Sequence, residues 1–154
     1  MSPESQETES QATDAAGAVV LHPIGAVETD TAAADLPRHW SLSDVEGTLV
    51  LHPDFVPGLR GVEPGQRIVV LFHFDRSPVF EPANMLVQSP RHLNGDSRGV
   101  FSICSPRRPN PVGLSVVEVL AIEDGRLRVR GLDMMDGTPI LDIKPHVEGR
   151  QVGG

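Results

Sequence analysis

Proline and glycine interrupt this chain so often that long helices are excluded. The 154 residues include 14 prolines and 15 glycines. Proline removes a backbone donor and glycine weakens a helix, so each tends to end a regular element. Aromatic residues make up only 4% of the chain, so the core must be built from valine, leucine and isoleucine, and two of these three favour strands. The sequence therefore predicts an all-β domain of short strands joined by turns and long loops.

About seven short segments have the composition of strands. They are residues 24–27, 48–51, 67–74, 99–103, 112–122, 126–130 and 138–143. Residues 67–74 are apolar on both faces for much of their length, which is typical of a central strand. Residues 126–130 alternate strictly, with Leu127 and Val129 expected inside and three arginines outside. The Asp124-Gly125 pair predicts a hairpin, because a type I′ turn needs φ > 0 at both central positions. This pattern indicates an antiparallel barrel or sandwich.

The chain is long enough for one domain, which we place at residues 18–148. Residues 1–17 are polar and acidic and predict a disordered tail, and residues 149–154 are expected to fray. Residues 78–98 contain four prolines or glycines and no sustained period. They predict a long loop with at most one helical turn near residues 83–87, and loops of this length are often functional.

Charge and cysteine content exclude several classes of protein. A net charge of −8 argues against a general grip on nucleic acid, although seven of the 13 basic residues fall within 91–130. Three of these seven, Arg126, Arg128 and Arg130, we interpret as a solvated face. The single cysteine excludes an intrachain disulfide, and no signal peptide or membrane span is expected, so we place the protein in the cytoplasm. Six scattered histidines lack the spacing of a metal site, and no metal is expected.

Residues 99–115, Gly-Val-Phe-Ser-Ile-Cys-Ser-Pro-Arg-Arg-Pro-Asn-Pro-Val-Gly-Leu-Ser, combine many backbone constraints with many polar side chains. The prolines are Pro106, Pro109 and Pro111. Each fixes φ near −65° and biases the residue before it towards extended backbone, which excludes helix. Two arginines, Asn110 and serine hydroxyls are then held at fixed angles. Taken alone, such a segment is more often a plain connection between strands than a binding site.

The same residues resemble a known signature, that of the TsaA-like family, also called TrmO. A second signature of this family is similar to residues 136–145, Asp-Gly-Thr-Pro-Ile-Leu-Asp-Ile-Lys-Pro, preceded by Leu132-Asp133. The resemblance covers nearly everything from Ile24 to Lys144, and it is to a short form without the C-terminal domain of longer relatives. It implies a small antiparallel β-barrel that forms homodimers, with S-adenosylmethionine held near the subunit boundary.

The resemblance also implies which residues form the site. The implied cofactor-binding residues are Arg38, His39, Trp40, Asp75, Arg76, Ser77, Cys104, Leu114, Gly131, Leu132 and Asp133. Because the chain is acidic, RNA binding needs a local basic patch, and the proline-fixed Arg107 and Arg108 are the candidates for it. Asn110 and Asp142 are the catalytic candidates. Simpler interpretations remain open, since Trp40 is also a natural packing residue, Asp133 a natural turn cap and Asp142 a natural salt-bridge partner. Many relatives carry arginine where this chain has Cys104, so Arg107 or Arg108 takes over any contact made by that arginine, or the substrate differs.

The family's members are S-adenosylmethionine-dependent tRNA methyltransferases. The implied reaction is transfer of a methyl group to the exocyclic nitrogen of a threonylcarbamoyl-modified adenosine beside the tRNA anticodon. Such a reaction needs placement more than acid or base catalysis, because the sulfonium is already activated. The alternative is a non-catalytic module that senses S-adenosylmethionine or a similar nucleotide.

Overall fold

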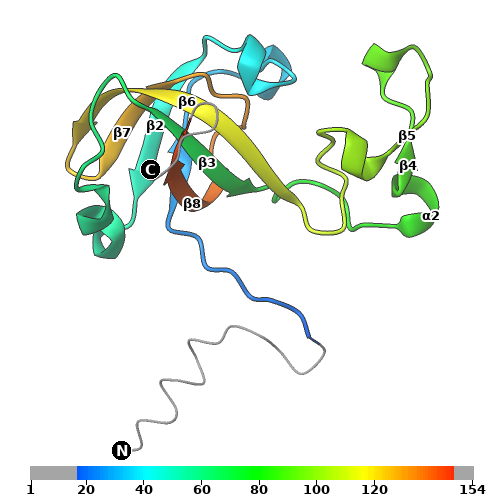
Figure 1. Ribbon diagram of the computed structural model, residues 1–154, viewed down its shortest axis with the longest axis horizontal. Coiled ribbons are helices and arrows are strands. Elements are labelled where there is room, and N and C mark those ends of the chain that lie inside the picture. The colour runs from blue at the N-terminus through cyan, green and yellow to red at the C-terminus, as the bar shows by residue number, and fades with distance from the viewer. Residues whose placement is uncertain (1–16, 148–154) are drawn as a thin grey trace, which may run out of the picture.

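Six antiparallel strands close into a barrel in the order β1-β2-β7-β6-β3-β8 (Figure 1). The strands are β1 (Gly25–Glu28), β2 (Glu46–Leu51), β3 (Arg67–His73), β6 (Val112–Glu123), β7 (Arg126–Arg130) and β8 (Pro139–Pro145). This computed structural model describes residues 17–147. The predicted tail before Gly17 and the predicted frayed end lie outside the described residues. The predicted all-β fold is confirmed, and β3 is a central strand with neighbours on both sides.

The alternation of β7 explains how the barrel separates its core from its surface. Leu127 and Val129 are fully buried, as predicted. The three arginines that alternate with them point outward, and each pairs with a glutamate. The pairs are Arg126–Glu28 at 2.6 Å, Arg128–Glu46 at 3.1 Å and Arg130–Glu118 at 3.5 Å. The predicted solvated face is therefore an exposed row of ion pairs, each of small net value.

The turn between β6 and β7 has the predicted geometry. Asp124 and Gly125 have φ of 49° and 77°, so both central residues adopt the left-handed conformation that a type I′ turn requires. Aspartate tolerates this conformation better than most residues, and glycine adopts it at no steric cost.

The barrel closes through a short seam between β1 and β8. The β3–β6 ladder runs through seven residue pairs, whereas β1 and β8 share two, Gly25 with Ile140 and Ala26 with Pro139. Two further backbone bonds extend the seam, from Ile24 N to Ile140 O (2.7 Å) and from Val27 N to Thr138 O (2.9 Å).

Between β3 and β6 the chain leaves the barrel as an arm, residues 76–111, which extends away from it (Figure 1). Its elements are α2 (Pro82–Met85), β4 (Val87–Gln88), η4 (Arg91–Leu93), β5 (Arg98–Gly99) and η5 (Val100–Ser102). Strands β4 and β5 form a two-stranded ribbon. Within the arm only Met85 and Val100 are buried. The helical turn predicted near residues 83–87 is confirmed by α2.

The predicted strand over residues 99–103 is wrong. Only Arg98–Gly99 pairs as a strand, and Val100–Ser102 is a 3₁₀ turn. The Val100 amide donates to Leu86 O (2.8 Å) and the Ser102 hydroxyl donates to Gly99 O (2.7 Å), so a turn closes directly after the two-residue strand β5.

The remaining helical elements are 3₁₀ turns in the loops of the barrel, η1 (Ala33–Asp35), η2 (Trp40–Leu42) and η3 (Pro53–Leu59). From residue 17 to residue 147, no helix is both long enough and apolar enough to cross a membrane.

Candidate functional site

A cavity of about 810 Å³ opens at the end of the barrel where the arm departs and returns. We call it the barrel cavity. Because β3 and β6 are antiparallel, with His73 opposite Val112, the end of one strand and the start of the other lie together. The loop before β2 and the turn after β7 complete the wall. The lining comes from residues 33–40, 72–78, 103–108, 112–114 and 133–138, though not from every position in these ranges.

Nine of the eleven predicted cofactor residues line this cavity. They are Arg38, His39, Trp40, Asp75, Arg76, Ser77, Cys104, Leu114 and Asp133. The other two, Gly131 and Leu132, lie behind the wall, and Leu132 is fully buried in the core. Their amides both donate to Val45 O, at 2.9 and 3.1 Å. These bonds fix the course of the chain into Asp133.

Asp133 is the half-buried carboxylate of the cavity. Burial raises its pKa above the ordinary value of 3.8, while a hydrogen bond from Ser115, the charge of His39 and a backbone hydrogen bond from Trp40 act in the opposite direction. The Ser115 hydroxyl donates to Asp133 Oδ1, and Ser115 itself is fully buried on β6. Asp133 thus ties the barrel wall to the loop that carries His39 and Trp40.

The loop that carries Trp40 forms one side of the cavity. The Trp40 ring is half-buried, lies 5.0 Å from the His39 ring and has the Arg67 guanidinium 5.9 Å from its centroid. His39 Nδ1 is 2.7 Å from Ser41 Oγ, which holds the imidazole at the start of η2. Trp40 is not part of the barrel core.

The two phenylalanines of the wall were not singled out from sequence. Phe72 and Phe74 line the cavity edge to face, with centroids 5.0 Å apart. Gly113 faces them from β6, and a Cβ at that position would collide with the Phe72 ring. Two phenylalanines at period two where a strand ends, opposite a glycine, are the sequence signal for this wall.

Several polar residues at the rim bind backbone carbonyls. Arg76 Nη2 donates to Asp136 O, and Ser77 Oγ donates to Pro106 O (3.1 Å). Arg108 Nη1 donates to Ile103 O (3.0 Å) and Ser105 O (2.9 Å). Arg108 therefore helps to hold the conformation of residues 105–111, which we call the proline-rich segment.

The two catalytic candidates lie outside the barrel-cavity lining. Asp142 is on β8, and its Oδ2 is 2.9 Å from Lys144 Nζ, which is the salt bridge expected under the simpler interpretation. Asn110 is exposed in the proline-rich segment, and its carbonyl accepts from the Val112 amide at 2.7 Å.

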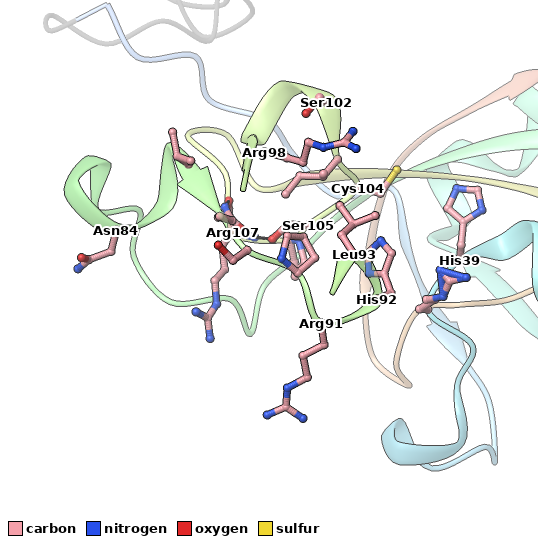
Figure 2. Close-up of a pocket in the computed structure, with 17 residues that line it drawn as sticks. His39, Asn84, Arg91, His92, Leu93, Arg98, Ser102, Cys104, Ser105 and Arg107 are labelled. Carbon is pink, nitrogen blue, oxygen red and sulfur yellow. Dashed lines mark hydrogen bonds between the residues drawn. The ribbon is translucent and has the colours of Figure 1, made fainter. Parts of the chain in front are cut away.

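A second cavity, of about 840 Å³, lies within the arm, between residues 84–98 and residues 102–107 (Figure 2). We call it the arm cavity. It shares part of its wall with the barrel cavity, namely Arg38, His39, Ile103, Cys104, Pro106 and Arg107. The exposed thiol of Cys104 thus stands at the boundary between the two. Within residues 17–147, no group of three or more histidine, cysteine or acidic residues is arranged to hold a metal ion.

The fold and site define a small antiparallel β-barrel domain whose loops enclose two adjoining cavities, one of mixed polarity and one basic. More specifically, the chain belongs to the family described as the tRNA-methyltransferase O N-terminal domain, whose profile matches residues 29–150. The resemblance to the TsaA-like, or TrmO, family is thereby confirmed.

Similar proteins include some named for cofactor binding and some named for methylation of tRNA. A protein of Archaeoglobus fulgidus named as an S-adenosyl-L-methionine-binding protein is 37% identical over 129 residues, which cover 83% of this chain and 89% of that protein. The mouse tRNA (adenine(37)-N6)-methyltransferase is 35% identical over 140 residues, or 86% of this chain and 32% of the mouse protein. The crystal structure of TrmO from Pseudomonas aeruginosa matches with a TM-score of 0.65 and 36% identity, covering 84% of this chain and 56% of that one. The chain thus spans just over half of that structure.

Proposed function

We propose that the protein binds S-adenosylmethionine in the barrel cavity and transfers its methyl group to tRNA. The observation that carries this proposal is the composition of the cavity wall. Trp40 and Phe74 offer apolar ring surface to an adenine, with Phe72 packed edge to face against Phe74. Asp133 offers a half-buried acceptor to a hydroxyl or amino group. Family membership and the names of the relatives support the same cofactor.

The bound cofactor would supply a methyl group already activated on a sulfonium. The protein would hold the cofactor, orient the acceptor towards the methyl group and exclude water from the site. Asp133 is well suited to orientation, because Ser115 and the Trp40 amide fix its carboxylate. The loop of His39 and Trp40 shields the same side of the cavity. Asn110 and Asp142 stay as proposed catalytic residues, to be tested by substitution with alanine and asparagine and measurement of the transfer rate at saturating cofactor.

The acceptor we propose is the exocyclic nitrogen of a threonylcarbamoyl-modified adenosine beside the anticodon, and we propose that the reaction takes place in the cytoplasm. The name of the mouse relative and the exposed guanidinium of Arg107 at the cavity rim support it. The test is to incubate the purified protein with methyl-labelled cofactor and total tRNA, then to digest the tRNA and separate its nucleosides. We expect label in the modified adenosine, and none with tRNA transcripts that carry unmodified adenosine. Label in another nucleoside would contradict this acceptor.

Cofactor binding needs a separate test. We expect calorimetry to show that Asp133→Asn weakens binding of S-adenosylmethionine at neutral pH, because a charged acceptor is lost from the wall. Asp54→Asn, an exposed residue of η3 outside both cavities, is the matched control and should bind like the wild type. Equal affinity of all three proteins would refute a cofactor contact by Asp133.

A second function, a non-catalytic sensor of S-adenosylmethionine, is favoured by one observation. The relative from Archaeoglobus fulgidus is matched over 89% of its length and is named only for cofactor binding. Cofactor binding by calorimetry together with no label transfer to total tRNA would favour the sensor over the methyltransferase.

We also propose that the protein is a homodimer joined through the arm. Val79 and Phe101 are 87% and 81% exposed, and the arm buries little of its own surface. A second copy of the chain would cover these side chains. Sedimentation should therefore give a dimer for the wild type and a monomer for Phe101→Ser, whereas Leu42→Ser, which changes an exposed apolar residue on a barrel loop, should stay dimeric. A monomeric wild type at concentrations well above micromolar would refute the dimer.

A further inference from the structure

The arm cavity has an unusual charge composition for an acidic protein. Its wall contains four arginines and two histidines and no aspartate or glutamate. The basic residues are Arg38, His39, Arg91, His92, Arg98 and Arg107. The whole chain has a net charge of −8, and the barrel cavity next to it includes Asp75 and Asp133 in its wall. Positive charge is therefore concentrated in this cavity.

The pairing of these arginines differs from that of the arginines on β7. All three β7 arginines form ion pairs with glutamates. Over the described range 17–147, neither Arg91 nor Arg107 forms an ion pair. Arg98 pairs with Asp96 at 2.9 Å, so its charge is partly compensated. Arg91 and Arg107 thus keep uncompensated charge at the wall of one cavity, and both side chains extend outward from it (Figure 2).

The cavity is also held in shape by hydrogen bonds between its two walls. Gln88 Nε2 donates to Met85 O and to Arg107 O, both at 2.7 Å, so a single amide joins α2 and the proline-rich segment across the arm. The hydroxyls of Ser89 and Ser97 are 3.1 Å apart across the ribbon loop. These contacts fix the backbones that carry Arg91 and Arg107 before any ligand binds.

We infer that the arm cavity binds backbone phosphates of the acceptor RNA, with Arg91 and Arg107 as the principal contacts and Arg98 as a weaker one. This inference rests on the proposed tRNA substrate. Exposed arginines hold a small anion weakly against water, whereas an RNA strand makes several phosphate contacts at once and releases its counterions. The shared wall at Cys104 lets one strand occupy the arm cavity while a base reaches the barrel cavity.

The test compares single arginine substitutions that change the net charge equally. Binding of total tRNA is measured by filter retention at several salt concentrations for the wild type, Arg91→Ala, Arg107→Ala and Arg128→Ala. Loss of one phosphate contact reduces the salt slope by about one unit. We expect this reduction and a several-fold weaker affinity for Arg91→Ala and Arg107→Ala. Arg128→Ala on β7 should match the wild type. Arg91→Ala and Arg128→Ala, which change residues outside the barrel cavity, should bind S-adenosylmethionine like the wild type by calorimetry.

The possible outcomes separate this inference from the proposed function. If Arg91→Ala and Arg107→Ala behave like Arg128→Ala while the wild type still methylates tRNA, the arm cavity is not the phosphate site and the methyltransferase proposal stands. If the wild type shows no salt-dependent tRNA binding, both the phosphate site and the tRNA substrate are overturned. Charge reversal by Arg91→Glu should weaken binding further, and an unchanged affinity there would also overturn the inference.

Discussion

The barrel and the arm are built on different principles within one short chain. The barrel contains 13 buried apolar residues in one cluster, and each of its strands pairs with two neighbours. The arm buries only two side chains and relies on prolines and local hydrogen bonds for its shape. Both regions line the cavities. The barrel side of the site is held in place by core packing, and the arm side is held by prolines and hydrogen bonds. Stability is therefore expected to depend on the barrel, and RNA affinity on the arm.

Removing a core side chain from the barrel should have the largest effect. Leu127→Ala deletes a fully buried side chain and should lower the free energy of unfolding by about 2–5 kcal/mol. Val87→Ala on the exposed ribbon of the arm should change it by less than about 0.5 kcal/mol. Urea denaturation followed by circular dichroism measures both. Equal losses would show that the arm is packed as firmly as the barrel.

Substitution of Gly113 tests the packing where the arm returns to the barrel at the start of β6. A Cβ at Gly113 would collide with the Phe72 ring, so Gly113→Ala should cost about 1–3 kcal/mol through overpacking. It should also weaken cofactor binding, because Phe72 lines the barrel cavity. Gly99→Ala in the arm is the control, since nothing lies within 4 Å of the new Cβ and φ is −64°. Calorimetric cofactor titrations and urea midpoints should agree, and a neutral Gly113→Ala would mean that Phe72 has another position available.

Arg107 and Arg108 are neighbours in the arm, but we expect one to affect RNA binding and the other to affect stability. Arg108→Ala removes two hydrogen bonds to backbone carbonyls and should cost about 1 kcal/mol of stability. Arg107→Ala should leave stability within about 0.5 kcal/mol and at the same time weaken tRNA binding. Thermal unfolding and filter binding distinguish them. The reverse pattern, with stability lost only in Arg107→Ala, would contradict the assignment of Arg108 to the loop.

The smallest effect we predict is a change with pH at Asp133. Burial raises the pKa of Asp133 in the folded state, so its contribution to stability is present below the ordinary value of 3.8 and is lost as pH rises through the folded pKa. Asp133→Asn keeps an oxygen that can accept from Ser115. Because asparagine does not ionise, the variant does not lose stability as the pH rises. The variant should therefore gain stability relative to the wild type between about pH 4 and pH 7. Urea midpoints across that range test it, and a difference independent of pH would contradict it.

Sequence reasoning predicted the barrel better than the arm for a physical reason. Strands such as residues 126–130 carry a period of two that follows from burial of one face, and this pattern is readable without knowing the partner strand. The turn at Val100–Ser102 has no such pattern, because it depends on Leu86 O and Gly99 O being within reach. Nine of the eleven predicted cofactor residues line the barrel cavity, through the resemblance and the proline-rich segment. Phe72, Phe74 and Ser115 were missed, because their importance follows from strand register, which only the closed barrel defines.

The short seam between β1 and β8 determines where the closed barrel opens. Only two residue pairs and a few flanking bonds join these strands, so separating them breaks less structure than separating any of the longer ladders. Local opening in proteins follows the regions with the least buried contact. The amides of Ile24 and Val27 should therefore exchange with deuterium earlier than those of β3. Since Val27 O also accepts from Gly137 at 2.7 Å, each opening of the seam would loosen the turn that precedes β8 and supplies the cavity wall at Thr138.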